Sequence, residues 1–157
     1  MADYIKYIRN LVGHAPIICV GTSVIAKNEL GSVLFQQRTD NGLYSFPGGM
    51  CEMGENTEDT AKRELLEEVG IVADELTLCG VVSGKNNYYQ YPNGDEVHNI
   101  TLVYACNVGP AQAQALSETK AIKWICFDEC STLELSAPTQ VMITTLNQEI
   151  KNILDNL

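Results

Sequence analysis

The chain has few basic residues, and this shortage limits what it can bind. Its 157 residues include 10 lysines and arginines against 20 aspartates and glutamates, which gives a formal net charge of −10. The basic residues are dispersed, so they form no stripe that could follow a nucleic-acid backbone. We therefore expect no long nucleic acid as a partner, whereas a small phosphorylated ligand escorted by a metal cation is compatible with this charge.

Long apolar runs and paired metal-binding residues are also missing. No apolar run approaches the roughly 18 residues of a membrane span, and Asp3, Lys6 and Arg9 interrupt the first 13 residues, which do not resemble a signal peptide. We expect a cytoplasmic protein without a membrane partner. The six cysteines are scattered and the two histidines are isolated, so we expect reduced thiols, no disulfides and no zinc site.

The apolar pattern that is present indicates one domain, over residues 1–157, with 45% hydrophobic residues. Runs rich in β-branched residues predict strands over residues 16–26, 32–37, 76–82, 96–108 and 121–127, the first two forming a hairpin. Apolar residues at helical spacing predict helices over residues 3–12 and 138–157. These elements predict an α/β (α+β) fold in which a mixed sheet lies between helices.

The strongest helix prediction covers residues 57–69. Asn56 or Thr57 can cap its start, and Gly70 can end it. At 100° per residue, Glu64 and Glu68 lie about 40° apart, with Glu67 within about 100° of both. The helix therefore carries three carboxylates on one face, beside an apolar face that can dock on a sheet (Ala61, Leu65 and Val69).

Three carboxylates on one helix face repel one another unless a cation lies between them. The repulsion reaches about 4 kcal/mol per pair at 4 Å and an effective dielectric of about 20. Hard oxygen ligands select magnesium, manganese or calcium, and Mg²⁺ leaves coordination positions for water and phosphate. We expect Mg²⁺ as the cofactor, with Mn²⁺ as a substitute, against the alternative of a solvated acidic face.

The residues around this face distinguish a metal site from a solvated acidic face. Five residues separate Gly49 from Glu55, and seven more separate Glu55 from the segment RELLEEVGI, which begins at Arg63. Such a combination would occur by chance on the order of once in ten million chains of this length. The spacing therefore favours a functional site.

This pattern resembles the signature of the Nudix hydrolase family (MutT-like) without a departure. The resemblance implies an α/β/α sandwich and a Mg²⁺-dependent pyrophosphohydrolase that cleaves a phosphoanhydride bond. It implies metal binding by Glu64, Glu67 and Glu68, helped by the Gly48 carbonyl. It also implies orientation of these groups by Arg63, a loop braced by Glu55, and structural roles for Gly49 and Gly70.

The general base has more than one candidate. In the family it comes from the signature or from a later loop, and some relatives place an extra metal-binding glutamate where this chain has Glu118, six residues ahead of Trp124. A solvent-facing loop residue is the alternative for Glu118. Asp95 and Glu96 are weaker candidates for the same role.

Several residues outside the signature are candidates for substrate binding. Arg38 could meet a phosphate oxygen or form a surface salt bridge, and Phe46 could line the pocket or pack in the core. Residues 83–95 read as a substrate lid with Lys85 near a phosphate and Tyr88 and Tyr89 stacked on a base. The competing reading is a hairpin whose tyrosines pack locally or at a homodimer contact.

The sequence leaves several substrates and more than one function open. The substrate class is a nucleoside diphosphate linked to another group: a nucleoside triphosphate, a dinucleoside polyphosphate or a nucleotide sugar. A non-catalytic nucleotide-binding module is one alternative, which the intact acidic set disfavours. An allylic diphosphate isomerase is another, and Cys51 alone supports it thinly.

Overall fold

A computed structural model describes residues 3–110 and 113–157. The helices are α1 (Tyr4–Val12), α2 (Thr57–Val69) and α3 (Ala137–Asn156), with short 3₁₀ segments η1 (Lys85–Asn87) and η2 (Phe127–Thr132). The strands are β1 (Ile17–Lys27), β2 (Val33–Arg38), β3 (Tyr44–Ser45), β4 (Gly48–Met50), β5 (Thr77–Val82), β6 (Tyr88–Gln90), β7 (Glu96–Asn107) and β8 (Thr119–Ile125).

The strands form one mixed sheet around two long parallel strands. The order is β3-β2-β1-β7-β5, while β4 pairs with β1, β6 with β7 and β8 with β2. β1 and β7 run parallel in register from Ile17 opposite Val97 to Lys27 opposite Asn107, and the other pairs are antiparallel. The hairpin predicted for the first two strands is confirmed by their antiparallel pairing.

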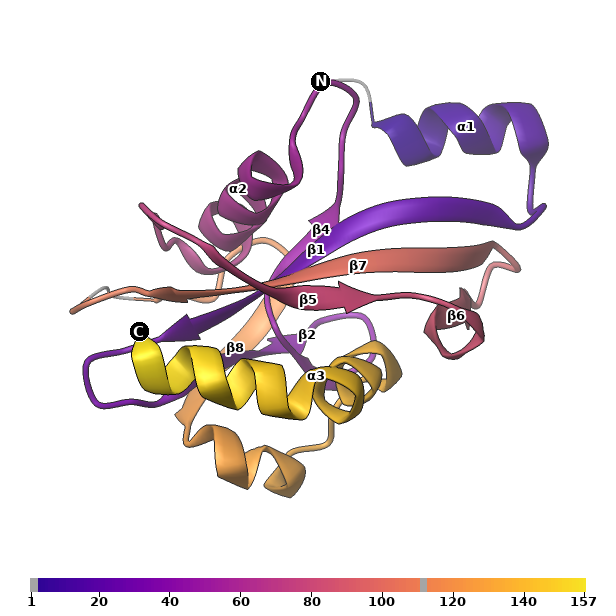
Figure 1. The fold of residues 1–157 in the computed structure, drawn as a ribbon. Helices are drawn as coiled ribbons and strands as arrows, with labels where there is room; N and C mark the ends of the chain where they lie inside the picture. The colour runs from indigo at the N-terminus through magenta and orange to yellow at the C-terminus, as the bar shows by residue number, and fades with distance from the viewer. Residues whose placement is uncertain (1–2, 111–112) are drawn as a thin grey trace.

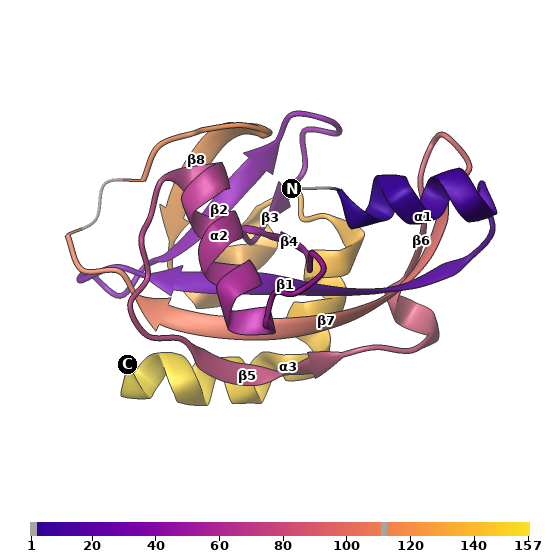
Figure 2. The ribbon, with the colours of Figure 1, turned by 90° about the horizontal axis from the view of Figure 1, so that it is seen from above.

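The sheet is covered on both faces, α2 on one side and α3 on the other (Figure 1; Figure 2). Because side chains alternate along a strand, each central strand supplies both cores. Ala61, Leu65 and Val69 of α2 are fully buried against one face, as their spacing predicts. Leu146 and Ile150 of α3 pack on the other face. The α/β/α arrangement predicted from the sequence is confirmed.

The ends of α2 follow from local sequence. The Asn56 side chain accepts a hydrogen bond from the Asp59 N–H at 2.8 Å, which satisfies one donor of the first turn. At the other end Gly70 adopts φ of 71°, a left-handed conformation that favours glycine, and its N–H reaches the Leu66 carbonyl at 3.0 Å. The predicted helix bounds are therefore confirmed at both ends.

The sequence pattern missed the shortest strands. β3 and β4 lie in a stretch expected to be a loop, and β6 lies in the predicted lid. Two or three residues show no periodicity of their own; pairing with a longer neighbour makes them strands. All six cysteines, which lie among the described residues, are free. The helices of the described residues lack the combined length and apolar character that crossing a bilayer requires.

Candidate active site

A cavity of about 500 Å³ opens where α2, the β6–β7 hairpin and the start of α3 meet. Carboxylates of α2 and of the loop before β8 form the acidic side of its lining, Asp40 lies beside Arg38 in the lining, and the hairpin and the start of α3 contribute uncharged side chains. The acidic side includes Gly48, Gly49, Glu64, Glu67, Glu68 and Glu118. The uncharged side chains include Phe46, Tyr89, Tyr91, Asn99, Thr101, Ser136, Thr139 and Met142.

Arg63 ties the loop before α2 to the helix. Its Nε donates to Glu55 Oε1 at 2.6 Å and its Nη2 donates to Glu55 Oε2 at 3.0 Å, while Nη2 also reaches the Met50 carbonyl at 3.1 Å. The hydrogen bonds from Arg63 lower the pKa of Glu55 to about 2, and the same contacts raise the pKa of Arg63. Both groups therefore stay charged throughout the neutral range.

Arg63 also holds Glu64, and Gly49 makes room for it. Arg63 Nη1 donates to Glu64 Oε1 at 2.7 Å. A Cβ on Gly49 would lie only 2.3 Å from the same oxygen, so a glycine is needed for the carboxylate to lie against the loop. Desolvation raises the pKa of Glu64 despite the opposing effect of Arg63.

Glu68 is the most buried of the three helix carboxylates, with 7% of its surface exposed. Its Oε2 accepts hydrogen bonds from the Gly48 N–H at 2.9 Å and from Gln36 Nε2 at 2.8 Å. Burial raises the pKa of Glu68 to about 7 even though both hydrogen bonds favour the charged form. Sequence reasoning missed Gln36, although a glutamine within a buried strand is itself a signal.

Glu67 and Glu118 complete the acidic side of the cavity. The Glu67 side chain is 57% exposed and lies 3.3 Å from Arg63 Nη1. Glu118 lies on the loop before β8, which is tied to α2 through the Leu116 N–H and the Glu68 carbonyl at 3.0 Å. Ser117 has φ of 49°, a conformation that is uncommon for a residue other than glycine. This turn brings Glu118 to the cavity that the helix carboxylates line.

These carboxylates provide donor atoms suited to a hard divalent cation, but they do not yet converge. In residues 3–110 and 113–157 no three acidic, histidine or cysteine side chains are grouped closely enough to hold a metal ion. Arg63 Nη1 engages Glu64 at 2.7 Å and Glu67 at 3.3 Å, so these two carboxylates are held toward the guanidinium. The donor set fits Mg²⁺.

Polar atoms without partners support a ligand at this cavity. Thr22 Oγ1, Ser45 Oγ and Asn99 Oδ1 are buried with no hydrogen-bond partner in the described part of the chain, and all three residues line the cavity. An unpaired buried polar atom costs about 1–3 kcal/mol. Such costs are expected where a ligand or water supplies the missing partner.

Three of the predicted substrate residues line the cavity. Arg38 lies there, but it donates to Asp40 through Nε at 2.9 Å and Nη2 at 2.7 Å, so the salt-bridge alternative also applies. Phe46 contacts both the cavity and the core, with its ring 4.7 Å from that of Phe35. Tyr89 faces the cavity beside Tyr91, whose ring lies edge-on at 4.8 Å.

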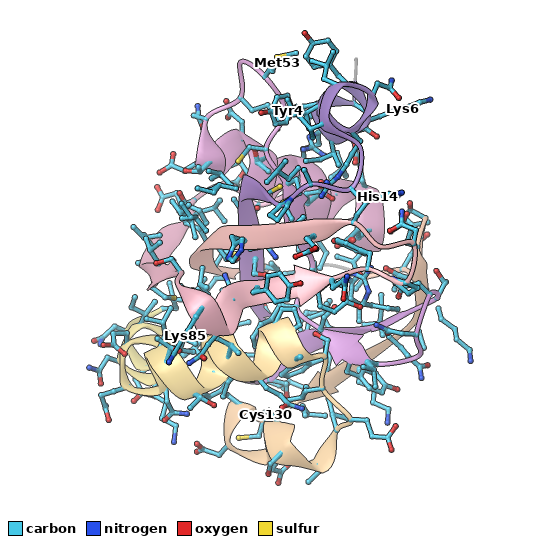
Figure 3. All side chains as sticks on the ribbon, turned by 90° about the vertical axis from the view of Figure 1, so that its right-hand side faces the viewer. Tyr4, Lys6, His14, Met53, Lys85 and Cys130 are labelled. Carbon is cyan, nitrogen blue, oxygen red and sulfur yellow. The ribbon has the colours of Figure 1, made fainter. Side chains whose placement is uncertain are left out.

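Lys85 and Tyr88 are not among the residues that line the cavity, which corrects the expected placement of both. Figure 3 shows Lys85 beside α3, and η1, which carries it, packs against that helix. Tyr88 precedes Tyr89 in β6, so alternation directs it to the opposite face, where its ring lies 5.1 Å from His98. Residues 83–95 therefore form a hairpin whose two faces differ: Tyr88 packs locally, and Tyr89 lines the cavity.

The weaker base candidates also lie outside the cavity lining. Asp95 pairs with His14 at 2.7 Å and with Arg9 at 3.6 Å, contacts that join the hairpin to α1. Glu96 accepts a hydrogen bond from the Tyr88 hydroxyl at 2.9 Å. Both carboxylates thus have structural partners away from α2.

Comparison with known proteins identifies the class that this fold and site define. The NUDIX domain family model matches residues 18–146. A MutT-like protein of Streptomyces ambofaciens is 31% identical over 116 residues, covering 74% of this chain and 69% of its own. An ADP-ribose pyrophosphatase of Methanocaldococcus jannaschii is 27% identical over 105 residues, covering 67% of this chain and 59% of its own.

The fold agrees with a solved structure as well. The MutT protein of Methanosarcina mazei superposes with a TM-score of 0.70 at 21% identity, over 85% of this chain and 96% of that one. The chain belongs to the Nudix family, and it is a hydrolase that acts on phosphoanhydride bonds. It spans less than two thirds of the length of several curated relatives.

Proposed function

We propose that the chain is a Mg²⁺-dependent pyrophosphohydrolase for a small nucleotide-type diphosphate, with Mn²⁺ as a substitute. The observation that carries this proposal is the cavity, whose lining combines four glutamates with aromatic and uncharged polar residues. The acidic side suits a metal-bound diphosphate, and the uncharged residues suit a base and a sugar. The family's general use of divalent metals supports the cofactor.

Each group of cavity residues has its own proposed role. Glu64, Glu67, Glu68 and Glu118 would hold the ion, with the Gly48 carbonyl beside them. Bound Mg²⁺ supplies positive charge that offsets the diphosphate and Lewis acidity toward its oxygens. Arg38 binds a phosphate oxygen by exchanging its contact with Asp40, and Tyr89 stacks on the base.

Hydrolysis then needs a proton acceptor. Water attacks one phosphorus, a new phosphorus–oxygen bond forms, and the anhydride oxygen leaves with the other phosphate. A carboxylate on the acidic side accepts the proton from the attacking water. Glu118 is one candidate because it lines the cavity and is exposed, and the helix glutamates are the others.

Neither alternative gains support from the cavity. An isomerase of allylic diphosphates would need a cysteine in the cavity, and the described lining residues do not include Cys51. A module that only binds nucleotides would have no chemical need for four carboxylates beside the phosphate. Such a module would bind the same nucleotide as the proposed hydrolase, so the test must detect turnover.

The test is a substrate screen with the purified chain and Mg²⁺ or Mn²⁺. The panel contains nucleoside triphosphates, dinucleoside polyphosphates, ADP-ribose and nucleotide sugars, and the readout is released mononucleotide and phosphate. We expect metal-dependent hydrolysis of at least one member, abolished by a chelator. The proposal is contradicted if no member is cleaved, or if a chelator leaves cleavage unchanged.

A further inference from the structure

Gln36 is a buried polar residue that has no role in the proposed hydrolysis. It lies in β2 with 2% of its surface exposed, and its side chain reaches Glu68 of α2. A buried carboxamide is costly unless both of its ends are hydrogen-bonded. Both ends are: Thr119 donates to Oε1, and Nε2 donates to Glu68 Oε2 at 2.8 Å.

The Glu68 carboxylate sets the direction of this carboxamide, and the Thr119 hydroxyl complements it. Thr119 begins β8, which pairs with β2, and its side chain is buried beside Gln36. With the Thr119 hydroxyl donating to Oε1, the amide nitrogen is directed at the Glu68 carboxylate. The reverse orientation would place the amide oxygen against a carboxylate oxygen, which is repulsive.

The two donors on Glu68 meet the same oxygen. Gln36 Nε2 and the Gly48 N–H both donate to Oε2. Within the described chain, Oε1 of Glu68 accepts no hydrogen bond from a donor. One oxygen is thus fixed by the protein, while the other is left for a ligand at the cavity.

We propose that Gln36 is a positioning residue for Glu68. With Thr119 behind it, the Gln36 carboxamide fixes Oε2 and so presents Oε1 toward the divalent metal ion. The inference rests on the proposed function, since it assigns a ligand role to Glu68. Residues that orient metal ligands in this way typically change metal affinity or activity by about 10- to 100-fold when replaced.

Substitutions along the Thr119–Gln36–Glu68 contact test the proposal. Gln36→Leu removes both hydrogen bonds at similar size, Thr119→Val removes only the hydroxyl, and Thr119→Ser retains it. Gln37→Leu is the matched control, because Gln37 faces the other side of β2 and donates to the Gly42 carbonyl at 2.9 Å. Mn²⁺ binding to the substrate-free protein is measured by electron paramagnetic resonance, beside kcat, KM and the melting temperature.

A positioning role predicts a particular set of results. Gln36→Leu should weaken Mn²⁺ binding at least tenfold and lower kcat by about the same factor, with KM for the nucleotide changed less than threefold. Thr119→Val should shift both values in the same direction by a smaller factor. Thr119→Ser and Gln37→Leu should match the wild type. A purely structural role would lower the melting temperature and leave the Mn²⁺ affinity of the folded protein unchanged.

Wild-type Mn²⁺ affinity in folded Gln36→Leu overturns the proposal. If Gln36→Leu does not fold, wild-type Mn²⁺ affinity in Thr119→Val overturns it instead. The metal readout does not depend on turnover. A wild-type chain that binds Mn²⁺ but cleaves no nucleotide would refute the proposed function and leave the role of Gln36 to be decided by the Mn²⁺ affinities.

Discussion

Arg63 and Glu55 are joined by two hydrogen bonds, of 2.6 Å and 3.0 Å, between positions eight residues apart. The pair closes the loop that leads from the cavity into α2. Arg63 also holds Glu64. The Arg63 side chain therefore links the charge of Glu55 to the position of a carboxylate on the acidic face.

Glu55→Gln should therefore destabilise the protein at neutral pH. Glu55 has its pKa lowered from 4.5 to about 2, so its contribution to stability is fully present above pH 4.5 and is lost as the pH falls toward 2. We expect a melting temperature several degrees lower at pH 7, from the loss of charge-assisted hydrogen bonds worth about 1.5–3 kcal/mol each. Melting curves of Glu55→Gln and the wild type between pH 2 and 7 test this difference in melting temperature.

The difference between wild type and Glu55→Gln should shrink as the pH falls through that window. Glu75→Gln, at an exposed position between α2 and β5, is the control and should melt like the wild type. A constant difference at all pH values would show that the effect does not come from the ionised Glu55.

Gly49→Ala should impair the metal site while leaving the fold intact. The new Cβ would meet Glu64 Oε1 at 2.3 Å, which is the end of a flexible side chain and can move aside. We expect turnover to fall at least tenfold, with a melting temperature within a few degrees of the wild type. Gly48→Ala is a contrasting variant, because its Cβ would meet the Thr22 carbonyl at 2.0 Å and the backbone must shift. Equal turnover in Gly49→Ala and the wild type would contradict the close approach of Glu64.

The two faces of the β6–β7 hairpin should respond differently to substitution. Tyr89→Ala removes a ring that lines the cavity, whereas Tyr88→Ala removes one that packs on His98. Base stacking is worth about 1–3 kcal/mol and helps ground and transition states alike, so Tyr89→Ala should raise KM about tenfold with little change in kcat. Tyr88→Ala should keep the wild-type KM. An equal effect of both variants, measured on the best nucleotide substrate, would refute this assignment.

Divalent cations should stabilise the folded chain by mass action. The unfolded chain cannot assemble the acidic site, so Mg²⁺ at 100 times its dissociation constant should add about 2.7 kcal/mol of stability. Replacing Glu64 and Glu67 together by glutamine should remove most of the rise in melting temperature. A rise of the same size in the double variant would place the stabilising ion elsewhere.

The sequence predicts α2 well because its determinants are local. Asn56, Gly70 and the apolar positions between them all act within one helix, and each lies as its spacing indicates. The separation of Glu64 and Glu68 from the apolar face follows from the same geometry. The helix and its acidic face could therefore be derived without knowledge of the rest of the chain.

Contacts between distant residues could not be derived in this way. Gln36 meets Glu68 across 32 positions, and nothing in either local pattern indicates the pairing. The register of β6 on β7 decides that Tyr89 rather than Tyr88 faces the cavity, because a shift of one residue would exchange the two. Local sequence does not set that register, so the sequence could not separate the two tyrosines.

Turnover by Glu68→Gln is the most direct test of the metal-dependent hydrolase. Glu68 is buried at the acidic side of the cavity, and glutamine keeps its size while removing the charge, so the fold should survive with unchanged or slightly higher stability. With saturating Mg²⁺ and the best substrate of the screen, we expect kcat to fall about a hundredfold or more. A folded Glu68→Gln protein that turns over at the wild-type rate would contradict the account.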